Sequence, residues 1–408
     1  MTKFTFNTFL IKAMLLTIVL SVNTACGQQT KIKNKSIPKT IRTANNETIV
    51  GAERTKLYID QIKDKNIAVV ANPSSLILNT HLVDSLLAMG INVKTVMSPE
   101  HGFRGDAGAG EHIKSGVDSK TGLPIISLYG SHKKPTKEDL KDIDILIFDL
   151  QDVGARFYTY LSTLNLCMEA CAENNVQLIV FDRPNPNGSY VDGPILQPDY
   201  KSFVGMNPIP IVHGMTLGEL ATMINGEYWL NDSLQCDLKI IEINNWNHSK
   251  RYILPVRPSP NLPNEASILQ YPSLCLFEGT IVSIGRGTDY PFQCYGHPEF
   301  KSFETSFTPK PIKGVAPHPK LEGKECKGYF PTVSNDKIEL EWLIGAYTEL
   351  YKNSKFFNSF FSKLAGTNQL QKQIEDGWSA EEIRASWQPA LIEFKKTRSK
   401  YLLYKDFE

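Results

Sequence analysis

Short apolar runs alternate with amphipathic segments through residues 53–243 of the chain. Runs of strand length occupy 66–71, 93–97, 125–128, 145–148 and 178–181. Between them, 81–89 and 159–173 have the spacing of amphipathic helices. The runs are apolar on both faces, which is typical of buried parallel strands. The pattern therefore predicts an α/β fold built on a Rossmann-like parallel sheet.

The second half of the chain changes character, with prolines, aromatic residues and short strand-like pieces, followed by predicted helices at 337–351 and 380–401. We predict a Rossmann-like catalytic domain over 49–258 and a smaller auxiliary α/β domain over 259–408. The segment 255–263 contains four prolines and forms the natural linker. A cleft between two such domains is a favoured place for a small-molecule site.

The N-terminus has the pattern of an export signal. Residues 1–25 contain lysines followed by an apolar stretch at 13–22 that is too short to span a bilayer comfortably. Cys26 follows two small residues, as in a bacterial lipobox, and 26–48 are polar enough for a flexible tether. We expect an exported lipoprotein, anchored to a membrane through Cys26 and facing the periplasm or cell surface. The alternative is a plain signal peptide that happens to contain a cysteine.

Charge balance, missing motifs and cysteine spacing argue against several classes of function. The 44 basic and 43 acidic residues give a net charge of +1, so we expect no nucleic-acid partner. No dinucleotide fingerprint or P-loop follows a predicted strand, which argues against nicotinamide and ATP. Cys167 and Cys171 lie four apart on one predicted helix, but no second ligand pair is near them in the sequence. We therefore predict that these two cysteines are buried free thiols rather than metal ligands.

Clusters of reactive residues follow three of the predicted strands. The clusters are 98–105, 149–152 and 182–186. Carboxyl ends of parallel strands share one edge of a sheet, where open α/β folds bind their ligands. Glu100 could serve as a general acid if burial raises its pKa, or could cap a helix or pair with Arg104. His101 fits a structural or a substrate-orienting role.

The second cluster combines carboxylates with aromatic residues. Asp149 and Asp152 cannot face the same way on a straight strand, so at most one of them is expected to be catalytic. Arg156 follows, and then Tyr158 and Tyr160, whose rings could stack on a sugar. Aromatic residues at the start of a helix are equally typical of a core, and Asp152 could simply cap that helix.

The third cluster forms a rigid, proline-rich turn. Arg183 could clamp a ligand carboxylate or could pair with Asp182, and Asn185 lies in the same turn. His213 could reach the cleft. The segment 216–219 has the pattern of a helix N-terminus with a capping box, which needs no function to explain it.

The second half offers another carboxylate and another arginine. Glu278 precedes a Gly-Arg-Gly turn centred on Arg286. Its glycines could let the backbone approach a ligand closely, although turn formation alone would also produce them. Glycoside hydrolysis needs two carboxylates, one protonated and one ionised. Glu100 with Glu278, or Glu100 with Asp152, are the candidate pairs.

Taken together, these motifs resemble the NamZ/YbbC-type exo-β-N-acetylmuramidases. The matching segments are Ser98 to Gly105, Asp149 to Ser162, Asp182 to Pro186, Pro208 to Thr216, Pro258 to Asn261, Phe277 to Thr280 and Gly285 to Thr288. The resemblance runs from about Gly51 to the C-terminus. Asn187-Gly188-Ser189 departs from an expected Gly-Gly pair, which affects the shape of a loop rather than the chemistry.

The resemblance implies an enzyme that removes terminal N-acetylmuramic acid from the non-reducing ends of peptidoglycan fragments, without a cofactor or metal. It implies Glu100 as the general acid and leaves Asp152, Asp182 and Glu278 open for the second carboxylate. The arginines would receive the lactyl carboxylate of the sugar. The expected substrate-binding residues are His101, Arg104, Arg156, Tyr158, Tyr160, Asp182, Arg183, Asn185, His213, Asn261 and Arg286.

Two other functions compete with this interpretation. A surface-anchored protein that only binds cell-wall sugars could use the same cleft and the same arginines. An esterase acting on cell-wall acyl groups would need a serine nucleophile elbow, and the chain has no G-x-S-x-G sequence. The esterase is therefore the weaker alternative.

Overall fold

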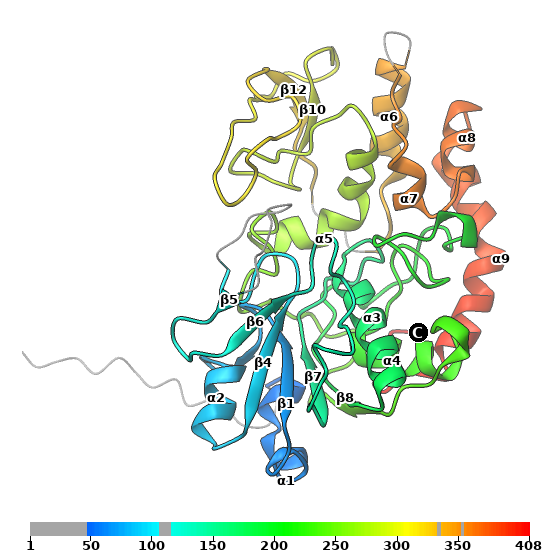
Figure 1. Cartoon of the computed structure of the whole chain (residues 1–408). Coiled ribbons are helices and arrows are strands. Elements are labelled where there is room, and N and C mark those ends of the chain that lie inside the picture. The colour runs from blue at the N-terminus through cyan, green and yellow to red at the C-terminus, as the bar shows by residue number, and fades with distance from the viewer. Residues whose placement is uncertain (1–46, 106–115, 333–335, 352–354) are drawn as a thin grey trace, which may run out of the picture. The chain divides into compact units, whose positions relative to one another are not determined.

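The computed structural model describes residues 47–105, 116–332, 336–351 and 355–408. A seven-stranded sheet with the order β5-β6-β4-β1-β7-β8-β9 lies at the centre of the N-terminal half (Figure 1). The strands are β1 (Ile67–Ala71), β4 (Val93–Ser98), β5 (Gly116–Val117), β6 (Pro124–Ser127), β7 (Ile145–Asp149), β8 (Gln177–Phe181) and β9 (Leu238–Ile241). Only β5 pairs antiparallel within this sheet. The predicted α/β fold with a mostly parallel sheet is confirmed.

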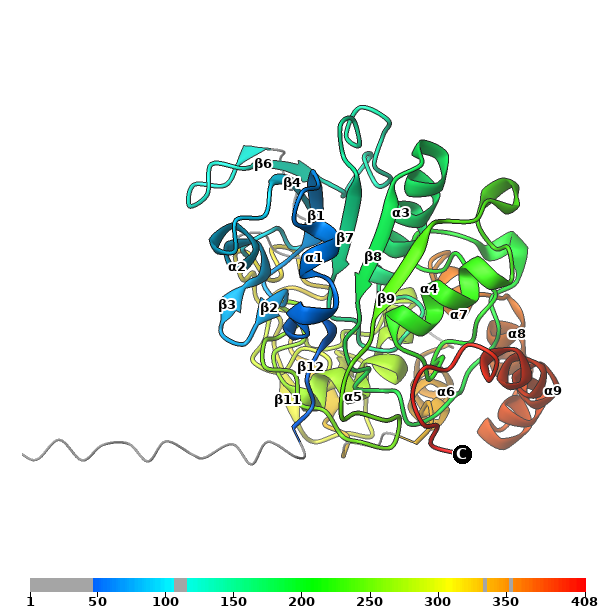
Figure 2. The ribbon, with the colours of Figure 1, turned by 90° about the horizontal axis from the view of Figure 1, so that it is seen from below.

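Both faces of the sheet are buried, as the apolar runs predicted. In β1, Ala68 and Val70 belong to one apolar cluster, whereas Ile67, Val69 and Ala71 belong to another on the opposite face. Helices α1 (Ile59–Ile62) and α2 (Leu82–Ala88) cover one face, and α3 (Tyr160–Asn174) and α4 (Leu217–Gly226) cover the other (Figure 2). Alternate residues of one strand therefore enter two separate cores.

Local sequence signals explain where several of these helices begin and end. Thr216 accepts a hydrogen bond from the backbone of Glu219, whose side chain returns one to Thr216, so the predicted capping box is confirmed. His81 caps α2 through its ring nitrogen. Asn175 ends α3 in the left-handed region, which asparagine tolerates well. Short elements complete this half: η1 (Gly51–Glu53), η2 (Thr55–Leu57), β2 (Leu76–Ile77), β3 (Thr80–His81), η3 (Pro198–Tyr200) and η4 (Asn231–Ser233).

The C-terminal half combines a small sheet with several helices (Figure 1). Its elements are α5 (Glu265–Leu274), η5 (Cys275–Gly279), β10 (Tyr295–His297), β11 (Ser306–Phe307), β12 (Cys326–Tyr329), α6 (Leu340–Leu350), α7 (Phe361–Ala365), α8 (Gln369–Glu375) and α9 (Ala380–Arg398). The antiparallel sheet has the order β10-β12-β11. The predicted helices at 337–351 and 380–401 correspond to α6 and α9.

The end of the chain returns to the N-terminal sheet. We call residues 402–408 the C-terminal tail. Within it, Tyr404 packs against Ile243 and Trp246, and its hydroxyl group donates a hydrogen bond of 2.6 Å to Asp182, directly after β8. The backbone N–H of Leu403 donates to Glu219 at 2.9 Å. The tail therefore completes the packing of an element formed some two hundred residues earlier.

The two halves also share their largest apolar core, which includes residues of α3 and α4 together with residues of α6 and α9. The domain boundary at 258–259 stays a prediction. The N-terminal signal, Cys26 and most of the predicted tether lie outside the described residues. Within the described part of the chain, we find no helix with the length and apolar character needed to cross a membrane.

Candidate active site

A cavity of about 730 Å³ is lined by residues that follow β4 and residues that follow α5. Glu100 and Glu278 both line it, together with Arg286 and Lys320. Further lining residues are Tyr129, Phe157, Thr159, Phe203, Val204, Tyr271, Cys275, Ser283, Ile284, Val315, Ala316, Pro317, His318, Pro319, Phe360 and Leu364. The volume is typical of a small-molecule site. Two of the three predicted catalytic carboxylates therefore share one cavity.

Glu100 is held at the end of β4 by hydroxyl groups on both of its carboxylate oxygens. Tyr129 donates to Oε1 at 3.3 Å, and Thr159 donates to Oε2 at 3.4 Å. The backbone next to it is strained, because His101 has a φ of 76° and is not a glycine. Strain of this kind persists where the surrounding structure enforces it, and it gathers at functional sites.

Glu278 lies in η5, where two cations surround it. The Nε of Arg286 donates a hydrogen bond of 2.5 Å to its carboxylate. The Nζ of Lys320 donates to the backbone carbonyls of Phe277 and Thr280 at 2.9 and 2.7 Å, which fixes the end of η5. Burial alone would raise the pKa of Glu278, but the charges of Arg286 and Lys320 outweigh it and lower that pKa. Glu278 therefore stays ionised down to low pH.

The glycines that flank Arg286 allow the backbone conformation of the turn. Gly285 and Gly287 have φ values of 77° and 80°. A Cβ atom on Gly285 would lie 2.5 Å from the carbonyl oxygen of Tyr290, and one on Gly287 would lie 2.4 Å from that of Lys310. Of the two explanations for the Gly-Arg-Gly pattern, close packing within the turn is the one that these contacts support.

Asp152 and His213 form a separate buried pair that does not line the cavity. The Oδ2 of Asp152 accepts from the backbone of Gly154 at 2.8 Å and lies 3.7 Å from the Nε2 of His213. Burial raises the pKa of Asp152 to about 7, and burial lowers the pKa of His213 to about 3. Of the two predicted pairs, the structure brings Glu100 together with Glu278 in this cavity.

Three of the predicted arginines make internal contacts. Arg104 pairs with Asp84 and Asp118 at 3.0 and 2.8 Å, not with Glu100. Arg183 pairs with Asp149 at 2.6 Å, where the sequence had suggested Asp182. Arg156 is fully buried and donates to four backbone carbonyls. Of the four predicted arginines, only Arg286 lines the large cavity.

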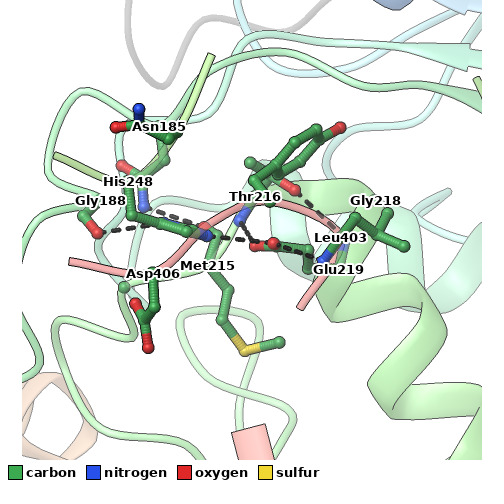
Figure 3. Close-up of polar contacts among 12 residues, drawn as sticks. Asn185, Gly188, Met215, Thr216, Gly218, Glu219, His248, Leu403 and Asp406 are labelled. Carbon is green, nitrogen blue, oxygen red and sulfur yellow. Dashed lines mark hydrogen bonds and ion pairs between the residues drawn. The ribbon is translucent and has the colours of Figure 1, made fainter. Parts of the chain in front are cut away.

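Asp182 and Asn185 belong to a buried network beneath the third cluster. Asp182 accepts from the hydroxyl of Thr216 at 2.6 Å and from the backbone N–H of Gly218 at 2.9 Å. The side chain of Asn185 donates to the carbonyl of Met215 at 2.9 Å. Figure 3 shows that this region also contains Glu219, His248 and Leu403, joined by hydrogen bonds. These contacts fix the turn after β8 and the start of α4.

The predicted tyrosines lie beside the catalytic candidates, but both are largely buried. Tyr158 donates to the carbonyl of Pro258 at 2.8 Å. Tyr160 accepts from the side chain of Asn72 at 2.8 Å, and its hydroxyl lies 3.4 Å from the backbone oxygen of Glu100. Asn261 donates to the carbonyl of Val315 at 2.8 Å, which holds the loop that borders the cavity.

Sequence reasoning missed several residues of the cavity. Tyr129 follows the predicted strand 125–128, so the rule that strand ends carry function could have found it. The sequence around Thr159 indicates only the start of a helix. His318 and Lys320 come from a segment with no periodic pattern, where the sequence offered no signal.

The chemistry available in the described part of the chain is that of carboxylates and cations. Its residues hold no group of three or more metal-ligating side chains. The cysteines at 167, 171, 236, 275, 294 and 326 are buried free thiols. Cys275 lines the cavity, but burial, with a contribution from Glu278, raises the pKa of its thiol to about 12. A neutral thiol is a poor nucleophile, so Glu100 and Glu278 stay the catalytic candidates in this cavity.

Comparison with known proteins gives consistent matches over most of the chain. Residues 67–266 match the model of the N-terminal domain of the exo-β-N-acetylmuramidase NamZ, and 269–404 match that of its C-terminal domain. The chain is 42% identical over 380 residues to the peptidoglycan β-N-acetylmuramidase NamZ of Bacillus subtilis strain 168, covering 85% of this chain and 89% of that protein.

Two crystal structures of DUF1343 family proteins from Bacteroides fragilis NCTC 9343 are also similar. The first is 49% identical with a TM-score of 0.83, covering 88% of this chain and 100% of that one. The second is 29% identical with a TM-score of 0.77, covering 88% and 99%. The similarity therefore extends through both halves of the fold.

Proposed function

Because the chain belongs to the family of NamZ exo-β-N-acetylmuramidases, we propose that it hydrolyses the bond to terminal, non-reducing N-acetylmuramic acid in peptidoglycan fragments. The observation that carries this proposal is the pair of carboxylates, Glu100 and Glu278, in one cavity of about 730 Å³. Most glycosidases use two carboxyl groups of this kind, in different protonation states.

The surroundings of the two carboxylates suggest how the roles are divided. Arg286 and Lys320 keep Glu278 ionised, which suits a nucleophile or a general base. We assign Glu100 as the acid that transfers its proton to the glycosidic oxygen as the C–O bond breaks. The sugar carbon then gains an oxygen from water, and the proton released by that water restores the enzyme.

Tyr129 and Thr159 position the acid. Each donates a hydrogen bond to a different oxygen of Glu100, so together they restrict rotation of the carboxyl group. A catalytic group that is fixed before the substrate binds loses less entropy in the transition state. This arrangement supports a catalytic role for Glu100 rather than a role confined to the protein interior.

The experiment that tests the activity measures release of free N-acetylmuramic acid from a muramyl-glucosamine disaccharide by the protein lacking residues 1–26. We expect release by the parent protein and loss of release in Glu100→Gln and Glu278→Gln. Asp152→Asn is the comparison variant, because Asp152 is buried away from the cavity. Loss of activity in Asp152→Asn but not in Glu278→Gln would move the second role to Asp152. Disaccharide binding without release by the parent protein would support a sugar-binding protein instead.

We also propose that the enzyme is an exported lipoprotein attached to a membrane through Cys26. The support comes from the sequence alone: an apolar signal, a cysteine after two small residues, and a polar tether. Metabolic labelling with a fatty acid in a bacterial host tests this. Labelling should occur in the full-length chain and vanish in Cys26→Ser, and unlabelled, freely soluble full-length protein would contradict the proposal.

A further inference from the structure

A small cavity adjoins the large one at Glu100. It has a volume of about 70 Å³, and Glu100 and Arg286 line both cavities. We call it the side pocket. Leu262 and Phe292 give it an apolar wall, and His101 adds a polar group. Since a water molecule needs about 10–15 Å³ of such space, the side pocket can hold a substituent of a few heavy atoms but no sugar ring.

His101 gives the side pocket a buried polar atom in need of a partner. Only 8% of the residue is exposed, and its Nδ1 makes no hydrogen bond to another described residue. A buried polar atom without a partner is costly and is rare in folded proteins. The backbone of His101 is also strained, with a φ of 76°, and such strain persists only where the surrounding structure holds it. Both features are explained if the pocket receives a polar group from the substrate.

Arg286 supplies the charge. Its ion pair with Glu278 runs through Nε alone, so neither terminal guanidinium nitrogen donates to a described residue. The guanidinium carbon lies 4.8 Å from the centre of the Phe292 ring, which restricts the plane of the group. A guanidinium held in this way still presents its two terminal NH2 groups, and such a fork fits a carboxylate.

We propose that the side pocket receives the lactyl substituent of the terminal sugar, with its carboxylate on Arg286 and His101 and its methyl group against Leu262 and Phe292. This inference rests on the proposed function. N-acetylmuramic acid differs from N-acetylglucosamine only by this lactyl ether. The side pocket is therefore where the enzyme distinguishes the two sugars.

The N-acetyl and hydroxymethyl groups are also small enough for the side pocket. Both are neutral and common to the two sugars, so they would gain less than a carboxylate from the cationic Arg286 and would give no discrimination. A carboxylate hydrogen-bonded to an ionised donor is held more strongly than a neutral amide. The chemistry of the wall and of the donors therefore favours the lactyl group.

Calorimetric binding in the Glu100→Gln background tests the proposal without interference from turnover. The ligands are the methyl glycosides of N-acetylmuramic acid, of its lactyl carboxamide and of N-acetylglucosamine, all at neutral pH. We expect the carboxylate to bind at least about tenfold more tightly than the carboxamide. Arg286→Met should bring this ratio close to one. Leu262→Phe, which fills the pocket, should weaken binding of both lactyl sugars and leave N-acetylglucosamine unaffected.

Arg257→Met is the matched control, because Arg257 is exposed and lines a different cavity. It should keep the carboxylate-to-carboxamide ratio. Thermal melting checks that each variant is folded, and Arg286→Lys, which keeps the charge but loses the fork, replaces Arg286→Met if that variant unfolds. An unchanged ratio in the Arg286 variant would overturn the inference. If the parent protein hydrolyses nothing but its background variant still binds the carboxylate at least about tenfold more tightly than the carboxamide, the proposed activity is wrong. The inference about the side pocket is then still supported.

Discussion

Arg156 offers a sharp test of the difference between a substrate-binding and a structural arginine. Its side chain is fully buried, and its terminal nitrogens donate to the carbonyls of Pro194 and Ile209 at 2.8 and 2.7 Å. They also donate to the carbonyls of Leu364 and Ala365 in α7, at 3.0 and 2.8 Å. One cation therefore joins a loop of the N-terminal half to a helix of the C-terminal half. We predict that Arg156→Lys destabilises the fold and leaves substrate affinity unchanged.

The magnitude follows from the four hydrogen bonds. A lysine side chain is one atom shorter than that of arginine and ends in a single nitrogen, so it can reach about two of the carbonyls. About two charge-assisted hydrogen bonds are then lost, worth roughly 1.5–3 kcal/mol each. The expected loss in the free energy of unfolding is about 3–6 kcal/mol. With an unfolding entropy of about 2.1 cal/mol/K per residue over some 350 described residues, the melting temperature should fall by about 4–8 °C.

The assay combines calorimetric melting with steady-state kinetics below the melting transition. The structural interpretation requires a lower melting temperature together with an unchanged KM for the disaccharide. Arg257→Lys, at an exposed position, is the control for the chemical change and should melt within about one degree of the parent protein. A raised KM with an unchanged melting temperature would refute the reasoning and return Arg156 to the substrate-binding residues.

Three further outcomes are expected. Tyr129→Phe should lower kcat roughly two- to tenfold, with a smaller change in KM, because one hydrogen bond that positions Glu100 is lost; an unchanged kcat would contradict this. Lys320→Met removes a positive charge that lowers the pKa of Glu278, so the acidic limb of the kcat/KM profile should move to higher pH, and an unmoved limb would count against Glu278. Burial, the largest cause, lowers the pKa of His81 to about 4, so near pH 5 this side chain is protonated only in the unfolded chain. The free energy of unfolding should therefore be full above pH 6.5 and fall by up to about 3 kcal/mol toward pH 4. His81→Asn should flatten that fall in denaturant titrations.

The sheet could be predicted because its signal is local. Each strand is a short apolar run with both faces buried, and alternate residues enter two cores. The capping box at Thr216 was equally readable, since both of its members lie within four residues. What the sequence could not show is which charged groups at the strand ends find partners inside the protein. Asp149 and Arg183 come from neighbouring strands, and their pairing depends on the order of those strands.

The candidate site also contains contacts that depend on tertiary packing and leave no signal in the sequence. Glu100 and Glu278 could be named in advance, because each lies in a distinctive motif. Arg156 also lies within a motif, yet two of its carbonyl partners follow it by about two hundred residues and carry no side-chain signal. Lys320 lies in a segment without periodicity and acts on backbone carbonyls. Partners of this kind are set by tertiary packing, which no window of sequence describes.

The C-terminal tail has a consequence for how the protein is made. Residues 402–408 leave the ribosome some two hundred residues after β8, yet Tyr404 supplies one of the hydrogen-bond partners of Asp182 at the end of that strand. The N-terminal sheet therefore cannot reach its final packing before residues 402–408 have been synthesised. Until these residues emerge, the nascent chain stays accessible to chaperones. We expect an affinity tag fused directly after Glu408 to weaken the packing of the N-terminal sheet, although the tag is some two hundred residues away from β8 in the sequence.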